Sequence, residues 1–269
     1  MQLFDTHCHI HEIVRATTPV HDKWIAGGVS NVDEIITEAQ ADGVTKAICV
    51  GTTLADSALA VEFVQEHEGF WASIGIHPHE AKEYLEDNSV KRQQFAALAA
   101  QPKVVAIGEC GLDYFYGHSP KADQIAVLRF QIDLALKHDL PLIFHVRDAF
   151  DDFWPIFDEY RGIRGVIHSF STDTAVLDQI LSRGLYVGLN GIMTFTKRPE
   201  QLAAAKAVPL DRLLLETDAP YLTPVPYRGT INRLKYVKNT AEFLAELRGE
   251  PLQTLADTTT VNAQKLFNV

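Results

Sequence analysis

Eight short apolar runs recur along this chain, and stretches that favour helix follow most of them. Several of these runs are continuously apolar, as at 47–50 and 104–107, instead of alternating with polar residues. Strands that are buried on both faces, as in a parallel sheet, have that pattern. The predicted strands are Leu3–Asp5, Lys46–Gly51, Phe70–Ile76, Val104–Gly108, Pro141–Phe144, Gly165–Ile167, Leu185–Leu189 and Leu213–Leu215.

The intervening stretches carry apolar residues three and four positions apart, which is typical of amphipathic helices. The predicted helices are Asn31–Asp42, Leu54–His67, Val90–Ala100, Ala122–His138, Asp173–Ser182, Glu200–Ala207, Lys235–Arg248 and Leu252–Phe267. The segments 10–30 and 220–229 are predicted to be long loops. Eight strand–helix alternations predict an α/β fold, a single-domain (β/α)8 TIM barrel over residues 1–269. A doubly wound open sheet is the alternative arrangement of the same elements.

The charge and cysteine content exclude some classes of protein. The chain has 24 Lys plus Arg and 35 Asp plus Glu, a formal net charge of −11. That charge argues against a protein that coats duplex DNA, but a nuclease that grips one strand end is still allowed. Cys8, Cys49 and Cys110 lack CxxC spacing and favour a reduced, cytoplasmic compartment. We expect neither a signal peptide nor a membrane span, because no charged and apolar leader and no run of about 18 apolar residues is present.

Histidines and carboxylates gather where the predicted strands end. A lone histidine at a strand end is usually structural, but six of the eleven histidines fall at this one edge. Active sites of (β/α)8 barrels form there, so we expect these side chains to converge. The residues are His7, His9, His77, His79, His145, His168, Glu109, Asp113, Asp148 and Asp218.

The spacing of these residues indicates a metal site. The two-residue pleat places His7 and His9 on one face of their strand, and it turns Cys8 away as a packing residue; Cys110 beside Glu109 is interpreted in the same way. Nitrogen and oxygen donors suit Zn, Mn, Mg and similar ions. Five or six donors exceed one tetrahedral site and match two ions with a shared carboxylate, an arrangement that serves hydrolysis. The chain has no G-x-G-x-x-G or Walker A motif, so no nucleotide cofactor is expected.

Six motifs, in order along the chain, resemble those of the TatD family of metal-dependent deoxyribonucleases, which belongs to the amidohydrolase-like barrels. They are FDTHCH at 4–9, GIHPHE at 75–80, VVAIGECGLDY at 104–114, LPLIFHVRDA at 140–149, GVIHSFS at 165–171 and LLLETDAPYL at 213–222, and PYRGTIN follows at 226–232. The resemblance covers residues 4 to 232 and the C-terminal helices.

The resemblance implies a site with two divalent ions, which Zn, Mg, Mn, Ni or Fe would satisfy. His7, His9 and Asp218 would hold one ion, His145 and His168 the other, and Glu109 would bridge them. Asp218 would also take a proton from the attacking water as general base. Asp113 is expected to orient a ligand by a hydrogen bond instead of binding metal.

The resemblance also implies substrate contacts. His77 would lie near the substrate phosphate and donate to an oxygen or to the leaving group, and His79 is a weaker candidate. Arg147 follows His145 by two residues and could form a bidentate contact with phosphate. The alternative is an ion pair with Asp148 or Asp113. Arg228 and Asn232 match family positions near the substrate.

Two departures from the family pattern concern the substrate side. The segment 10–30 is longer than usual and carries Trp24, which would either stack on a base or pack as an ordinary tryptophan. Leu234 stands where the family usually has proline.

These observations predict a metal-dependent hydrolase, with DNA phosphodiester bonds, from 3′ ends or on single strands, as the substrate. The alternative is another ester or amide, such as a lactone, a small amide or a D-aminoacyl-tRNA. A third reading is a non-catalytic scaffold, which the complete ligand set opposes. Related barrels often use a carbamylated lysine where Glu109 stands, and Glu109 together with Arg147 and Arg228 favours the nuclease.

Overall fold

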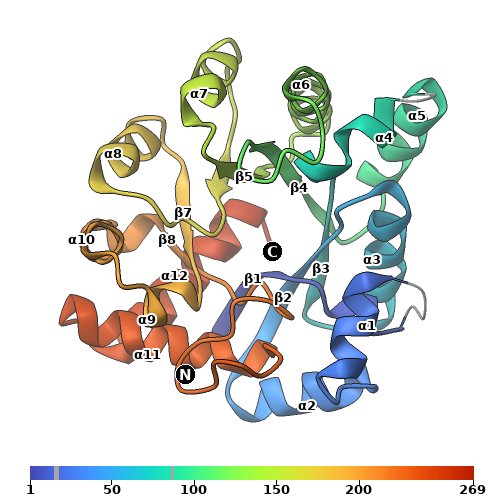
Figure 1. Cartoon of the computed structure of the whole chain (residues 1–269). Helices are drawn as coiled ribbons and strands as arrows, with labels where there is room; N and C mark the ends of the chain where they lie inside the picture. Colours follow the sequence, from blue (N-terminus) through green and yellow to red (C-terminus); the bar gives the residue numbers. More distant parts are fainter. Residues whose placement is uncertain (15–17, 86–87) are drawn as a thin grey trace. The chain divides into compact units, whose positions relative to one another are not determined.

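The computed structural model describes residues 1–14, 18–85 and 88–269 (Figure 1). The strands succeed one another in the order β1 to β8 in one sheet. The chain divides into two compact units, which are described separately below: unit 1 comprises Met1–Cys49 and Ser169–Val269, and unit 2 comprises Val50–His168. No helix in the described ranges is long and apolar enough to cross a membrane.

Unit 1 contains two parallel strand pairs, β1 with β2 and β7 with β8. A bridge between Cys8 and Ala219 also joins the end of β1 to the segment after β8. Helix α12 packs against β1 and β8. The strands are β1 (Leu3–Cys8), β2 (Val44–Val50), β7 (Tyr186–Leu189) and β8 (Leu213–Leu215). The helices are η1 (Ile10–Val14), α1 (Pro19–Ala26), α2 (Val32–Ala41), α8 (Thr174–Ser182), α9 (Ile192–Phe195), α10 (Pro199–Ala207), η3 (Leu210–Arg212), η4 (Leu234–Tyr236), α11 (Val237–Arg248) and α12 (Leu252–Phe267).

Unit 2 contains four strands that pair in parallel in chain order. They are β3 (Phe70–Ile74), β4 (Val104–Asp113), β5 (Leu142–Arg147) and β6 (Gly165–Ile167). Helix α3 packs on β3 and α6 on β4. The helices are α3 (Leu54–Glu66), η2 (Pro78–Glu80), α4 (Ala81–Leu85), α5 (Asn88–Ala99), α6 (Lys121–His138) and α7 (Phe150–Asp158).

Side-chain caps fix where several helices begin. Asn31 accepts a hydrogen bond from the backbone N–H of Asp33 at the start of α2, and Thr53 accepts one from Asp56 at the start of α3. Asp173 caps α8 in the same way. Each cap satisfies a backbone donor that has no partner inside the helix, which is why these helices begin next to polar residues that the sequence marks clearly.

Several elements differ from the sequence predictions, among them β1, which continues to Cys8 instead of ending at Asp5, and β5, which continues to Arg147 instead of ending at Phe144. Strand β4 continues to Asp113 instead of ending at Gly108, and α7 lies where no helix was predicted. The segment 10–30, predicted as a loop, contains η1 and α1, while residues 15–17 of it lie outside the described ranges. Helix α7 contains Pro155 but buries four large apolar side chains, so packing outweighs its poor local signal.

The continuation of β4 depends on a glycine. A Cβ at Gly111 would lie 1.9 Å from the backbone oxygen of His145 on β5. Only glycine allows the two strands to approach so closely. The stretch after Gly108, which was not included in the predicted strand, therefore pairs as part of β4, and it carries Glu109 and Asp113 beside His145.

Candidate active site

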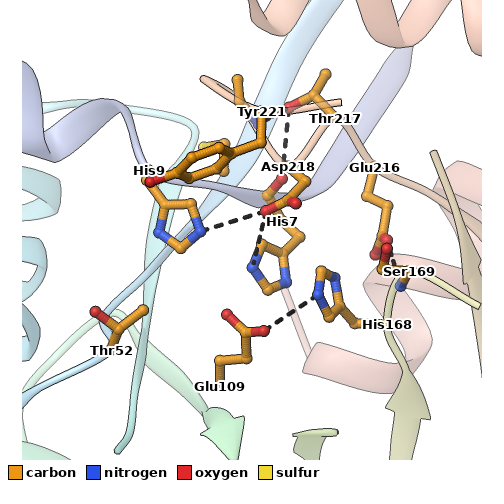
Figure 2. Close-up of polar contacts among 12 residues, drawn as sticks. His7, His9, Thr52, Glu109, His168, Ser169, Glu216, Thr217, Asp218 and Tyr221 are labelled. Atoms are coloured by element: carbon orange, nitrogen blue, oxygen red, sulfur yellow. Dashed lines mark hydrogen bonds and ion pairs between the residues drawn. The ribbon is translucent and has the colours of Figure 1, made fainter. Parts of the chain in front are cut away.

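In unit 1, three donors meet where β1 ends and where the chain leaves β8. The Asp218 Oδ1 atom lies 3.4 Å from Nε2 of His9 and 3.7 Å from Nε2 of His7 (Figure 2). One donor atom from each residue lies within 4.8 Å of the others, and both histidines are buried. Imidazole nitrogens and a carboxylate oxygen at this spacing fit a divalent cation.

Asp5 holds this donor set in position. Its carboxylate accepts hydrogen bonds from the Thr217 backbone N–H at 2.8 Å, from the Thr217 hydroxyl at 2.6 Å and from the His7 backbone N–H at 3.2 Å. In addition, the Asp218 N–H donates to the His7 carbonyl at 2.8 Å. Burial raises the pKa of Asp5 to about 8, against the opposite effect of these hydrogen bonds. The segment after β8 is thus tied to the strand that carries His7.

Unit 2 holds a second donor set around Glu109 on β4. The Glu109 Oε1 atom lies 2.7 Å from Nδ1 of His145, 3.2 Å from Nε2 of His168 and 3.4 Å from Nε2 of His77. Figure 2 shows the contact between Glu109 and His168. His77, Glu109 and His145 each present a donor atom within 4.8 Å of the others, which also fits a divalent cation.

Asp113 orients two of the histidines. Its Oδ2 atom lies 2.9 Å from Nε2 of His145 and 3.1 Å from Nε2 of His79. Its Oδ1 atom accepts hydrogen bonds from the backbone N–H groups of Phe115, at 2.9 Å, and Tyr116, at 3.3 Å. One buried carboxylate therefore fixes both the rings and the turn that follows β4, which is the arrangement of a ligand-orienting residue.

The pKa values of the buried carboxylates and histidines of the unit 2 donor set depend on one another. Burial works to raise the pKa values of Glu109 and Asp113, but the surrounding histidines outweigh it and hold both values well below the ordinary range. Burial lowers the pKa of His77 to about 4, despite the neighbouring Glu109. For His145, the hydrogen bonds to Asp113 and Glu109 outweigh burial, and its pKa is raised. Both carboxylates are therefore ionised at neutral pH and His77 is neutral.

Glu216 and Asp5 are site residues that the sequence analysis missed. The Glu216 Oε1 atom accepts hydrogen bonds from the Ser169 N–H at 2.6 Å and from the Asn190 amide at 3.2 Å (Figure 2). The side chain is buried against Gly188, where an added Cβ would lie 2.4 Å from its Oε2 atom. The signal was present for Asp5, which precedes His7 by two residues on β1, where the pleat repeats every two residues. Glu216 precedes Asp218 by two residues in the segment after β8.

The predicted substrate contacts differ in their surroundings. The Arg147 side chain is exposed, and its guanidinium lies over the rings of Phe115 and Tyr116 instead of pairing with Asp148 or Asp113. Arg228 is exposed too; it lies over the Phe195 ring and donates to the Thr223 carbonyl at 3.0 Å.

The predicted substrate contact of Asn232 is corrected, and of the two alternatives for Trp24 the structure shows the packed tryptophan. Asn232 is fully buried, and its amide donates to the carbonyls of Thr217, at 2.9 Å, and Tyr221, at 2.5 Å, so it shapes the loop and has no surface for substrate. Trp24 is fully buried with its Nε1–H directed at the His9 carbonyl at 3.3 Å, so it packs and cannot stack on a base. Cys8 and Cys110 are buried, as expected of packing residues.

These features define a metal-dependent hydrolase on a (β/α)8 barrel, and the comparisons with known proteins confirm that class. Residues 4–268 match the family described as TatD related DNase, and the chain belongs to that family.

Individual proteins of this class are similar to the chain over most of its length. A Bacillus subtilis (strain 168) protein described as an uncharacterized metal-dependent hydrolase, YabD, is 36% identical over 269 residues, covering 99% of each chain. A Cronobacter sakazakii protein named 3′-5′ ssDNA/RNA exonuclease TatD is 36% identical over 242 residues, covering 87% of this chain and 91% of its own. The crystal structure of YjjV, a TatD homologue from Escherichia coli K12, superposes with a TM-score of 0.84 at 29% identity, covering 99% of this chain and 98% of that one.

Proposed function

We propose that this protein is a divalent-metal-dependent exonuclease that hydrolyses phosphodiester bonds from the 3′ end of single-stranded DNA. The observation that carries the proposal is that imidazoles and carboxylates lie at ion-binding distances in each unit: His7, His9 and Asp218 in unit 1, and Glu109 with His145 and His168 in unit 2. The relative named as a 3′-5′ ssDNA/RNA exonuclease supports the substrate.

We assign the ion-binding residues as the family resemblance implies. His7, His9 and Asp218 would hold one ion, His145 and His168 would hold the other, and Glu109 would be the shared ligand. Bound divalent ions lower the pKa of a water molecule and neutralise charge on a phosphate oxygen. These nitrogen and oxygen donors suit Zn, Mg, Mn, Ni and Fe.

The protein's own residues supply proton transfer and orientation. Asp218, whose side chain is 15% exposed, takes the proton of the attacking water at its carboxylate. The Nδ1 atom of His77 accepts a hydrogen bond from the His79 N–H at 3.2 Å, so its proton resides on Nε2. Because the pKa of His77 is lowered to about 4, that Nε2–H is a neutral donor to a phosphate oxygen or to the leaving group.

Two features favour a phosphodiester over a neutral ester or amide. Arg147 and Arg228 both expose guanidinium groups, which match phosphate oxygens by charge and geometry. A lactone or small amide would leave both groups without a charged partner. We further propose that the enzyme works in the cytoplasm, since its three cysteines are free and buried.

The test is hydrolysis of 5′-labelled single-stranded and duplex oligonucleotides by metal-stripped protein, with Mg, Mn or Zn added back. We expect a ladder that shortens from the 3′ end, faster on single strands, and absent in an Asp218→Asn variant. No cleavage with any metal, although about two ions bind per chain, would contradict the nuclease and favour an ester or amide substrate.

A further inference from the structure

We propose that the turn after β4 is a stacking site for a nucleobase of the substrate strand. Phe115, Tyr116 and His118 form this site, here called the aromatic turn, and Arg147 completes it. The proposal rests on the proposed nuclease function and goes beyond it, because it specifies base-bearing single strands and the residues that hold them.

The aromatic turn exposes unusually large apolar rings. Phe115 is 56% exposed and Tyr116 is 54% exposed, and Tyr227 is the other Phe or Tyr of the described ranges that is exposed to a comparable degree. The packing of the core does not account for two adjacent aromatic rings in solvent. Adjacent exposed apolar rings are typical of binding surfaces.

The rings are held in a fixed arrangement. The Tyr116 ring stands on edge against Phe115, with centroids 4.7 Å apart, and lies nearly parallel to His118 at 5.6 Å. The His79 ring lies nearly perpendicular to that of Tyr116, with centroids 5.5 Å apart. Aromatic side chains held in this way lose little conformational entropy when a base stacks on them.

Arg147 adds a cation to the same surface. Its guanidinium carbon lies 4.0 Å from the centroid of Phe115 and 4.9 Å from that of Tyr116. In the described part of the chain, the Arg147 guanidinium forms no hydrogen bond or ion pair, so its N–H edges remain available to phosphate while one face covers the rings. A base and its phosphate, carried by the same nucleotide, match this pair of features.

The aromatic turn is coupled to the donor set of unit 2 through one carboxylate. Asp113 accepts hydrogen bonds from the backbones of Phe115 and Tyr116 with Oδ1 and contacts His145 and His79 with Oδ2. A strand stacked on the turn is therefore held beside His145, a proposed ion ligand, and His79. Stacking tolerates any base, which suits an exonuclease that must move along a sequence.

The experiment compares two single-stranded oligonucleotides, one complete and one with abasic tetrahydrofuran residues at its two 3′-terminal positions. The test variant is Phe115→Leu/Tyr116→Leu, which keeps apolar bulk but removes the aromatic faces. The matched control is Tyr227→Leu, the same change at an exposed tyrosine outside the turn. Metal content, gel-filtration mass and melting temperature are measured for each.

We expect the KM of the double variant for the complete strand to rise about tenfold or more, with kcat within about twofold of wild type. Hydrolysis of the abasic strand, metal content and the Tyr227→Leu control should not change. Phe115→Tyr/Tyr116→Phe, which retains both rings, should restore the wild-type KM.

Several results would overturn the proposal while leaving the nuclease function intact. These are equal KM values of the wild type for the two strands, an unchanged KM in the double variant, or an equal loss on both strands with reduced metal content. A changed gel-filtration mass would instead identify the turn as a protein interface. Absence of hydrolysis of any strand by wild-type protein would contradict the proposed function itself, and the stacking site with it.

Discussion

Glu109 is the central carboxylate of the unit 2 donor set. Its Oε1 oxygen lies within 3.4 Å of nitrogens from three histidines. The nearby imidazoles keep the carboxylate ionised although it is buried. A group with this many partners is sensitive to loss of charge, even when its shape is kept.

We therefore expect Glu109→Gln to lower turnover by at least about 100-fold and to reduce bound metal. Replacing a proposed metal ligand should cost more activity than replacing a residue that only orients a ligand. Circular dichroism should show an intact fold, and Glu62→Gln, an exposed change on α3, should have no effect. Wild-type turnover and metal content in the variant would rule out the bridging role.

The loop after β8 contains Asn232, which is buried, and Arg228, which is exposed, so we expect the two side chains to have different roles. Asn232→Ala removes two buried donors, so we expect the free energy of unfolding to fall by about 1–3 kcal/mol. Arg228→Ala removes an exposed cation and should raise KM with little effect on stability. Urea denaturation and steady-state kinetics on both variants check the pair, and a stable Asn232→Ala protein with a raised KM would restore the substrate role first assigned to Asn232.

At the scale of an element, the pairing of β4 with β5 depends on Gly111. In Gly111→Ala, the new Cβ would collide with the His145 backbone oxygen, so we expect a loss of about 1–3 kcal/mol or more in unfolding free energy and weaker metal binding.

Gly184→Ala provides the control, since it has φ of 73° and nothing within 4 Å of the added Cβ. It should show only the backbone cost, about 1–2 kcal/mol, with normal metal binding. Equal effects of the two substitutions on metal affinity, measured by isothermal titration calorimetry, would refute the clash argument.

At the scale of the whole molecule, buried histidines link stability to pH. The folded protein keeps His77 neutral down to about pH 4, whereas the unfolded chain takes up that proton near 6.5. Protonation of His77 thus favours the unfolded state, and the stability that neutral His77 contributes is lost as pH decreases from about 6.5 to about 4. His145 has a raised pKa, so it is charged in both states across most of this range.

For metal-free protein we expect His77 to contribute a fall in unfolding free energy of about 1.4 kcal/mol per pH unit through this range, and we expect Asp5, whose pKa is raised to about 8, to contribute the opposite slope. Glu109 and Asp113, with lowered pKa values, extend the loss below their ordinary values of 4.5 and 3.8. Urea titrations with chelator present measure the slope in both proteins, and the difference between wild type and His77→Gln should equal the His77 contribution between pH 6.5 and 4. The same slope in both proteins would assign the effect to other groups.

The sequence alone determined the number and order of the strands, although β1, β4 and β5 continue further than predicted. This was possible because the pleat repeats every two residues and parallel strands end at a common edge, so local spacing reports which side chains share a face. His7, His9, Glu109, His145, His168 and Asp218 follow from that rule and from the family resemblance.

Only the tertiary structure decided how Asn232, Trp24, Arg147 and Gly111 are used. Their surroundings come from other segments: the carbonyls of Thr217 and Tyr221 for Asn232, the His9 carbonyl for Trp24, the rings after β4 for Arg147 and the β5 backbone for Gly111. Burial and hydrogen bonding depend on those distant partners, and no pattern of neighbouring residues specifies them.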